Sequence, residues 1–140
     1  MSRIFWDTNL FVYLFEENPE FSQTVADLKR RMVERGDELV TSAMTLGEVQ
    51  VKPREKRNIE IAERYRNIIR QTCTVLPFDG AAADIYAELR ANSKVRSPDA
   101  IQLSCAAAAG VELFITNDRS LHRLTVPGIH FVTSLDRVPI

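Results

Sequence analysis

Four acidic residues in this sequence could together carry out metal-dependent chemistry. Asp7 follows the apolar run Ile-Phe-Trp, and Asp118 follows Leu-Phe-Ile-Thr-Asn. Glu48 lies in the segment VTSAMTLGE, and Asp99 lies in the helix-starting segment Ser-Pro-Asp. Carboxylates gathered in one crevice repel each other unless they are protonated or neutralised, and a multivalent cation is the usual neutraliser. Oxygen ligands without His or Cys are typical of Mg²⁺ or Mn²⁺ and speak against zinc.

A carboxylate site of this kind can hydrolyse a phosphodiester bond. A bound metal lowers the pKa of its water, and the same or a second metal, roughly 3.5–4 Å away, stabilises the attacking and leaving oxygens. The protein then has to supply ligands, one acid that orients the water, and neutral donors for the phosphate. The four acids are therefore a hypothesis for both the metal site and the catalytic site.

Each acid also has a purely structural explanation. Asp7 and Asp118 could cap the helices that follow them. Thr45 and Glu48 have the T-x-x-E spacing of a capping box. Asp99 could favour the positive end of its helix dipole. Convergence of all four at one place is harder to explain by capping alone, and the fold class predicts such a convergence.

The segments that must position these acids alternate between strands and helices. Short apolar runs predict strands over residues 3–6, 38–41, 74–77, 113–116 and 129–132. Apolar residues at three- and four-residue spacing predict helices over residues 10–15, 21–34, 61–69, 82–89 and 99–109. A further helix is expected from about Thr45, interrupted at Pro53, and Ser97 is expected to cap the helix that carries Asp99.

This alternation indicates a single α/β domain over residues 1–140, with a mostly parallel five-stranded sheet and helices on both faces. The carboxyl ends of parallel strands meet at one edge, where ligand sites form near a switch in strand order. Asp7 and Asp118 follow strands, whereas Glu48 and Asp99 lie near helix starts. We therefore expect the four acids to approach one crevice.

Composition limits the remaining classes. The chain is 45% apolar and 26% charged, which is typical of a globular domain. No apolar run approaches the roughly 18–20 residues of a membrane span, and the N-terminus does not resemble a signal peptide, so a cytoplasmic location is expected. Cys73 and Cys105 are expected to be free thiols.

The net charge of −1 weighs against a protein held on nucleic acid by charge alone. Residues 52–70 carry seven Lys or Arg against three Glu. This segment is expected to be either a solvated helix surface or a face that contacts phosphate.

Four motifs in order resemble the PIN domain, and the chain looks like the VapC-type toxins of bacterial and archaeal toxin–antitoxin pairs. The motifs are DTN after the first strand, the acid in TLGEV, SPDAIQLSCAAAAG, and FITND before a short helix. The resemblance covers essentially all 140 residues. Gln102, Ser104 and Cys105 depart from it, because they interrupt a run where the family often has small apolar residues.

The resemblance implies a five-stranded parallel sheet, endoribonuclease activity with Mg²⁺ or Mn²⁺, a homodimer, and an antitoxin whose tail blocks the acidic crevice. It implies that Asp7, Asp99 and Asp118 hold metal, and that Glu48 is a ligand or the water-orienting base. The polar support implied around them is Thr8, Asn9, Thr116 and Asn117. Lys94 and Arg96, near the site, are candidates for contact with RNA phosphate or plain surface residues.

Other functions stay open. The chain could be a PIN-like interaction domain that binds a partner without cleavage, or a DNA nuclease with the same metal site. An aspartate-phosphorylated protein is disfavoured, because Asn9 stands where the haloacid-dehalogenase-like phosphatases have a second Asp, and Asp79 reads as a helix cap rather than a phosphoacceptor. His122 and His130 are not expected to be ligands. The sequence identifies neither the RNA target nor the antitoxin.

Overall fold

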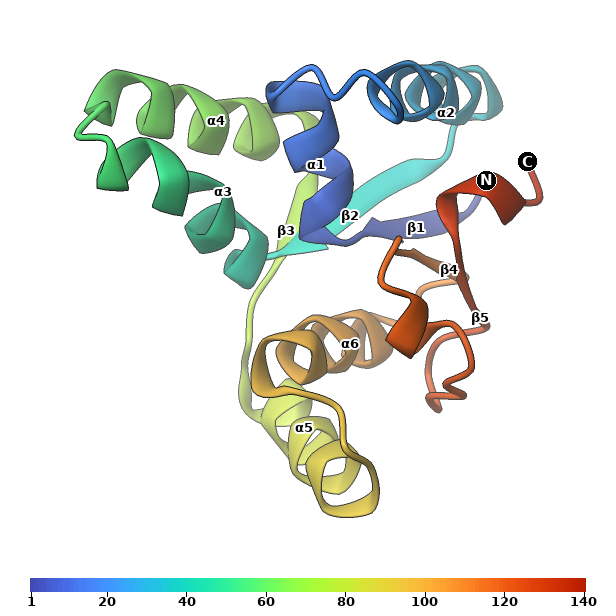
Figure 1. The fold of residues 1–140 in the computed structure, drawn as a ribbon. Helices are drawn as coiled ribbons and strands as arrows, with labels where there is room; N and C mark the ends of the chain where they lie inside the picture. The colour runs from blue at the N-terminus through green and yellow to red at the C-terminus, as the bar shows by residue number, and fades with distance from the viewer.

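Short apolar strands build one five-stranded sheet in the computed structural model, which describes residues 1–140 (Figure 1). The strands are β1 (Arg3–Trp6), β2 (Glu38–Ser42), β3 (Thr74–Leu76), β4 (Leu113–Ile115) and β5 (Phe131–Thr133). The helices are α1 (Thr8–Phe15), α2 (Ser22–Arg35), α3 (Ala43–Glu55), α4 (Ile59–Thr72), α5 (Gly80–Asn92) and α6 (Ser97–Ala109). Two short 3₁₀ helices, η1 (Arg119–Leu121) and η2 (Leu135–Arg137), follow β4 and β5.

The sheet is entirely parallel, with the strand order β3-β2-β1-β4-β5. The chain runs outward from β1 to β3 and then returns to the other side of β1 as β4. The strand order therefore reverses between β1 and β4, and a crevice at the carboxyl ends of these two strands is where open α/β sheets bind ligands. The predicted α/β class and the five strands are confirmed.

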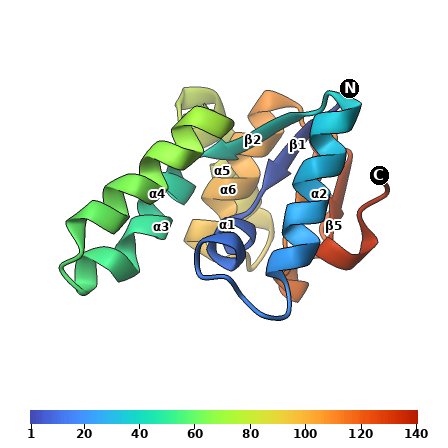
Figure 2. The ribbon, with the colours of Figure 1, turned by 90° about the horizontal axis from the view of Figure 1, so that it is seen from above.

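Both faces of the sheet carry an apolar core because successive strand side chains point to opposite faces. Ile4 and Trp6 of β1 belong to the core that α1 and α2 cover, whereas Phe5 belongs to the core that α5 and α6 cover. Phe5 stacks on Phe114 of β4 with ring centroids 4.7 Å apart. Figure 1 shows α1, α2 and α4 on one side of the sheet and α5 and α6 on the other. In Figure 2, α3 and α4 lie together at the edge opposite α2.

The predicted interruption of α3 at Pro53 was wrong. Pro53 lies within the last turn of α3, which continues to Glu55. A proline there removes one backbone hydrogen bond near a helix end, where the ladder is already incomplete. The break comes instead at Arg57, whose φ of 57° is left-handed, and at Asn58, whose side chain caps α4.

Two predicted caps also differ from the structure. Arg96, not Ser97, is the residue before α6, and it makes no side-chain capping bond. The Ser97 hydroxyl lies 2.8 Å from the Tyr86 hydroxyl, so it joins α6 to α5 instead. Ser42, not Thr45, caps α3 by accepting from the Met44 amide. Thr45 is therefore buried inside α3 and is free to serve the acidic site.

The remaining general features agree with the sequence. The two cysteines are unpaired, Cys105 buried and Cys73 half-buried. Asp79 caps α5, as expected, by accepting from the Ala82 amide at 3.0 Å. None of the helices combines the length and the apolar character needed to cross a lipid bilayer.

Candidate acidic site at the strand-order switch

Asp7 is the most buried of the four acids, with 7% of its surface exposed. It is the residue between β1 and α1, and one carboxylate oxygen caps α1 by accepting from the Thr8 amide at 2.8 Å. The other oxygen accepts from the Thr116 hydroxyl at 2.7 Å. Capping and a place in the site are therefore compatible roles for Asp7.

Thr116 joins the ends of β1 and β4. Besides donating to Asp7, its hydroxyl accepts from the backbone amide of Asp118 at 3.0 Å and from the Asn9 side-chain amide at 3.4 Å. Its backbone carbonyl accepts from the His122 ring at 2.7 Å. Thr116 is fully buried, and one hydroxyl thus fixes the relative position of Asp7 and Asp118.

Glu48 reaches the site from α3 through a hydroxyl. The Thr8 hydroxyl donates to the Glu48 carboxylate at 2.6 Å and lies 3.1 Å from the Thr45 hydroxyl. Thr45 in turn accepts from Thr41, the penultimate residue of β2, at 2.9 Å. The continuation of α3 past Pro53 keeps Glu48 in the interior of a regular helix.

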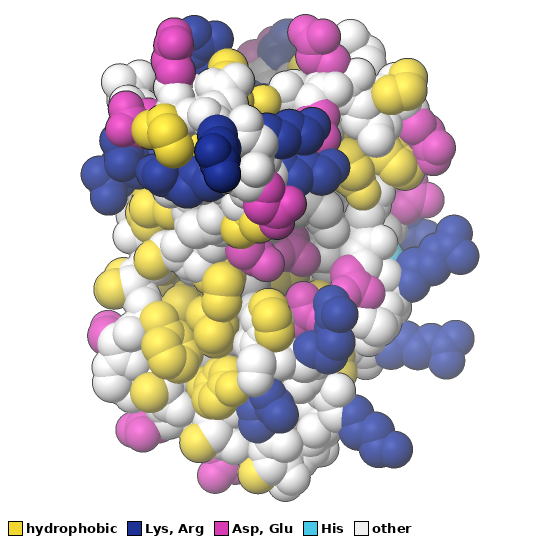
Figure 3. All heavy atoms as spheres, turned by 60° about the vertical axis from the view of Figure 1, so that its left-hand side comes forward, with side chains coloured by type: hydrophobic (Ala, Val, Ile, Leu, Met, Phe, Trp, Pro, Cys, Tyr) yellow, Lys and Arg dark blue, Asp and Glu magenta, His cyan; other side chains and the backbone are white.

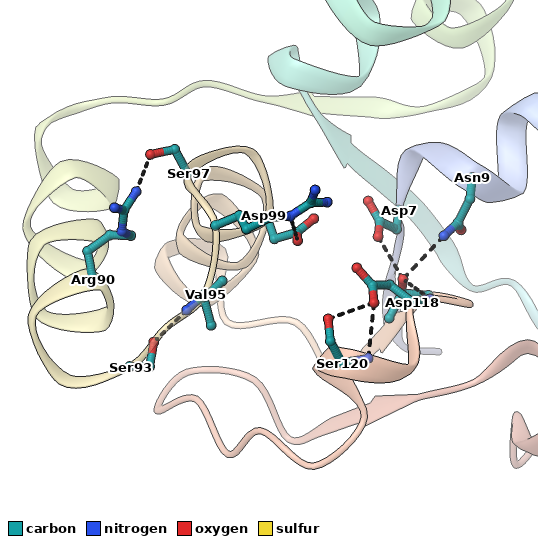
Figure 4. A network of polar contacts seen from close by, with 11 residues as sticks. Asp7, Asn9, Arg90, Ser93, Val95, Ser97, Asp99, Asp118 and Ser120 are labelled. Carbon is teal, nitrogen blue, oxygen red and sulfur yellow. Dashed lines mark hydrogen bonds and ion pairs between the residues drawn. The ribbon is translucent and has the colours of Figure 1, made fainter.

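Asp99 lies in the first turn of α6 and faces Asp7 and Asp118 (Figure 4). Its side chain is 15% exposed and lies 3.6 Å from the guanidinium of Arg96, which is 78% exposed. Asp118 caps η1 by accepting from the backbone amide and the hydroxyl of Ser120, at 3.0 and 2.6 Å. Four segments far apart in sequence thus bring one acid each to this edge of the sheet.

The acids influence each other's protonation. Burial is the main cause that raises the pKa of Asp7 above 3.8, and the negative charge of Glu48 raises it further, against hydrogen bonds that lower it. Burial also raises the pKa of Asp99, and the charges of Asp118 and Asp7 add to this against the lowering effect of Arg96. Burial together with neighbouring negative charges outweighs the groups that lower these two pKa values.

Gln102 is a site residue that the sequence reasoning missed. It is 1% exposed on α6, and its amide nitrogen lies 2.7 Å from the Thr45 hydroxyl, 3.1 Å from that of Thr8 and 3.3 Å from the Asp7 carboxylate. Its amide oxygen accepts from the Ser42 hydroxyl. Gln102, which interrupts the apolar run of α6, therefore links this helix by hydrogen bonds to the ends of β1 and β2 and to α3. A long amide side chain among the small and apolar residues of a buried helix was the available signal, because such groups require partners.

The other candidates lie at varying distances from the acids. Asn9 bonds Thr116, and its side-chain oxygen is buried without a hydrogen-bond partner. Asn117 instead secures later parts of the chain, because it donates to the Tyr13 hydroxyl at 3.4 Å and accepts from the Leu135 amide at 3.2 Å. Lys94 is exposed on the loop before α6, close in sequence to Arg96.

The donor set of the site fits a hard divalent cation in its chemistry. The acids supply only oxygen, and the buried side-chain oxygen of Asn9, whose amide nitrogen contacts Thr116, has no hydrogen-bond partner. No three Asp, Glu, His or Cys side chains are arranged as a ready-made metal cage. Glu48 accepts a hydrogen bond from Thr8, and Asp118 accepts one from Ser120. A metal ion would compete with these donors for the carboxylate oxygens.

Fold and site together define a small α/β protein with an acidic crevice at the switch point of a parallel sheet. Residues 4–127 match the PIN domain family, and the chain belongs to that family. No curated protein sequence matches the chain significantly.

Solved structures share the fold. VapBC2 from Rickettsia felis, bound to a DNA fragment from its promoter, has a TM-score of 0.76 and 18% identity, covering 94% of this chain and 98% of that chain. DNA-bound VapBC from Salmonella typhimurium has a TM-score of 0.69 and 23% identity, covering 96% and 99%. VapC20 from Mycobacterium tuberculosis, a sarcin-ricin-loop-cleaving toxin, has a TM-score of 0.66 and 16% identity, covering 87% and 96%.

Proposed function

We propose that this PIN-domain protein is a metal-dependent endoribonuclease, the toxin of a type II toxin–antitoxin system. The observation that carries the proposal is the convergence of Asp7, Glu48, Asp99 and Asp118 at the strand-order switch, with the pKa of Asp7 and of Asp99 raised. Membership of the PIN family and structural similarity to VapBC toxins over nearly the whole chain support it.

We propose a division of labour among the four acids that follows the resemblance to the PIN domain. Asp7, Asp99 and Asp118 would hold Mg²⁺ or Mn²⁺, which when bound supplies an activated water and charge stabilisation for phosphodiester hydrolysis. Glu48 is the fourth ligand or the acid that orients the attacking water. The buried Thr116 hydroxyl, which also accepts from Asn9, would hold Asp7 and Asp118 in fixed positions relative to each other.

An RNA cleavage assay tests the proposal. Wild-type protein is incubated with total bacterial RNA and a panel of structured RNAs, first with EDTA and then with Mn²⁺ in excess. Cleavage at discrete sites is expected only with the metal, and Asp7→Asn and Asp99→Asn are expected to abolish it. Asp84→Asn, an exposed acid on α5, is the matched control. Cleavage that persists in excess chelator, or full activity of both site variants, would contradict the proposal.

An antitoxin is the proposed protein partner. Beside Glu48 lies a cavity of about 660 Å³ between α1, α3 and α4, with apolar walls that include Phe15, Val49 and Tyr65. An antitoxin tail seated there would reach the acidic crevice, because Glu48 belongs to both. Co-purification of the chain with the product of an adjacent gene, with loss of cleavage in the complex, is the expected result.

We also propose that the chain forms a homodimer. Figure 3 shows apolar side chains gathered over the α5 side of the molecule, below the acidic and basic side chains of the α3–α4 side. Phe78, just before α5, is 43% exposed although it packs edge-on against Tyr86. Light scattering of wild type and Phe78→Asp is expected to give a dimer and a monomer, respectively.

A PIN-like interaction domain is the second candidate, and one observation favours it. The carboxylates of Glu48, Asp99 and Asp118 are engaged by protein donors rather than arranged as a metal cage. This candidate predicts a stable protein complex and no metal-dependent cleavage in the assay above. Cleavage of DNA but not RNA under the same conditions would favour the DNA nuclease.

A further inference from the structure

A second cavity lies beside the chain segment that carries Asp118, and no residue of α3 or α4 lines it. It has a volume of about 1150 Å³ and lies between the α1–α2 region, η1 and the segment 132–137. Asn117 and Arg119, the residues on either side of Asp118, both line it. None of the four acids lines this cavity, but the backbone segment that carries Asp118 forms part of its wall. We call this cavity the η1 groove.

Unpaired arginines line the η1 groove. Arg119, Arg123 and Arg137 are exposed, and none of their guanidinium groups makes an ion pair or a hydrogen bond within the protein. Elsewhere, Arg3 and Arg35 are paired with acids. Guanidinium groups with free donors are suited to phosphate, which they bind through two parallel N–H bonds.

Two carboxylates also line the groove, but the arginines outnumber them. Asp136 accepts from the Ser134 hydroxyl at 2.6 Å, so part of its hydrogen-bonding capacity is used. Glu20 lies at the start of the α1–α2 wall, and His122 binds the Thr116 carbonyl. The groove is thus positive on the wall formed by η1 and the C-terminal segment, next to a negative catalytic crevice.

Aromatic rings form part of the opposite wall. Tyr13 and Phe21 lie with ring centroids 4.6 Å apart and planes tilted by 31°. The Tyr13 hydroxyl accepts from Asn117, which places this ring beside the residue preceding Asp118. The groove therefore has arginines on one wall and aromatic rings on the other. Grooves that bind single-stranded nucleic acid combine these two features, because phosphates bind the cations and bases stack on the rings.

We propose that the η1 groove binds a single-stranded segment of RNA next to the phosphate cleaved at the acidic site. This inference rests on the proposed function, and it names the surface and the residues that would hold the RNA during cleavage. The arginines would hold two or three phosphates, and Tyr13 and Phe21 would stack an unpaired base. Duplex RNA is disfavoured because paired bases do not expose their faces to side chains.

The competing basic surface lies on α3 and α4. Several of its cations are already engaged: Lys52 with Glu16, Arg54 with Gln50, and Arg64 with Glu60. Arg57 and Arg70 have no such partner, and Arg66 contacts only Asn67. Replacing these three arginines removes the same charge as replacing the three of the groove. The α3–α4 set is therefore a matched control.

The test is a binding measurement without cleavage. Fluorescence anisotropy of a labelled random-sequence single-stranded RNA of about 12 nucleotides is followed in EDTA, over a range of salt. The proteins are wild type, Arg119→Ala/Arg123→Ala/Arg137→Ala, and the control Arg57→Ala/Arg66→Ala/Arg70→Ala. Five of the six arginines are exposed and Arg66 is half-buried, and a thermal scan checks that each variant is folded.

We expect the groove variant to bind RNA at least about tenfold more weakly than wild type at low salt, because each lost phosphate contact removes a release of counterions. Its slope of log affinity against log salt is expected to fall by about 2, since each contact to single-stranded nucleic acid contributes about 0.7. The control variant is expected to change less than threefold. A hairpin stem of the same length is expected to compete poorly.

Several results would overturn the inference. They are the absence of RNA binding by wild type, an equal loss in both triple variants, or a loss confined to the control. Cleavage by the groove variant with an unchanged KM would reject the groove while leaving the proposed ribonuclease intact. Selective loss of RNA binding in the groove variant, combined with no cleavage by wild type, would uphold the groove and reject the ribonuclease.

Discussion

The Thr116 hydroxyl donates a 2.7 Å hydrogen bond to the carboxylate of Asp7, 109 positions away in the sequence. Parallel pairing of β1 with β4 makes this contact possible, because it brings Trp6 opposite Ile115 and so aligns the residues that follow. The same hydroxyl accepts from the Asp118 amide. Two of the proposed ligands thus depend on one buried oxygen atom.

Thr116→Val should weaken the site without changing its shape. Valine keeps the volume of threonine, but Asp7 and the Asp118 amide each lose a partner. An unsatisfied buried group costs about 1–3 kcal/mol, so the thermal midpoint should fall and cleavage should drop. Thr125→Val, in an exposed loop, is the control. An unchanged midpoint and unchanged activity would show that the hydroxyl is dispensable.

The stability of the metal-free protein should depend on pH through Asp7 and Asp99. Both have a pKa above 3.8 in the folded chain, so the folded state binds these protons more tightly than the unfolded state does. Stability must then fall as the pH rises from 3.8 through the raised folded values. Asp7→Asn and Asp99→Asn remove this penalty, and Asn at position 7 can still cap α1.

The measurement is the thermal midpoint in EDTA over a pH series that runs from acidic conditions to neutrality, because both carboxylates have a pKa raised above 3.8 in the folded chain. Near neutral pH, each Asn variant should melt at or above the wild-type midpoint, and the difference should shrink on acidification. Asp84→Asn should follow wild type at every pH. Asn variants that are less stable at neutral pH, by a margin independent of pH, would contradict the electrostatic account.

Gln102→Met should impair the site although Gln102 is not expected to touch the metal. Methionine fills the space but leaves Thr45, Thr8 and Asp7 without the donor that holds them together. Loss of such a supporting partner typically lowers metal affinity by about 10- to 100-fold. Calorimetric titration with Mn²⁺ would measure this, with Ile101→Met as the control. Equal Mn²⁺ affinity in the two variants would reduce Gln102 to a packing role.

The sequence predicted the fold well because its strands are local and unambiguous. Residues 3–6 are bounded by Asp7, and the predicted strand coincides with β1. The other strands were predicted within one or two residues of their bounds. The alternation of strands with helices then predicts a parallel sheet, in which the acids lie at one edge. This prediction requires no information about contacts between distant residues.

The parts that were missed depend on long-range partners. Whether Gln102 is a defect in an apolar helix or a link to Asp7 is decided by what α6 packs against, and the sequence does not contain that information locally. The interruption at Pro53 was predicted from a rule for helix interiors, whereas α3 places this proline in its last turn. The apolar spacing predicted the helix α4 but not which of its residues face the core: Ile68 is 39% exposed, whereas Ala62 and Ile69 are buried.

The central claim is that the four acids form a poised metal site, and a titration without substrate tests it most directly. The thermal midpoints of chelated wild type and Asp7→Asn/Asp99→Asn are measured while Mn²⁺ or Mg²⁺ is added. A ligand bound only by the folded state raises stability, by about 2.7 kcal/mol at 100 times its Kd. We predict a metal-dependent rise for wild type and none for the double variant. No rise in either protein, with chelated wild type as stable as the variant, would contradict the metal site and favour the interaction domain.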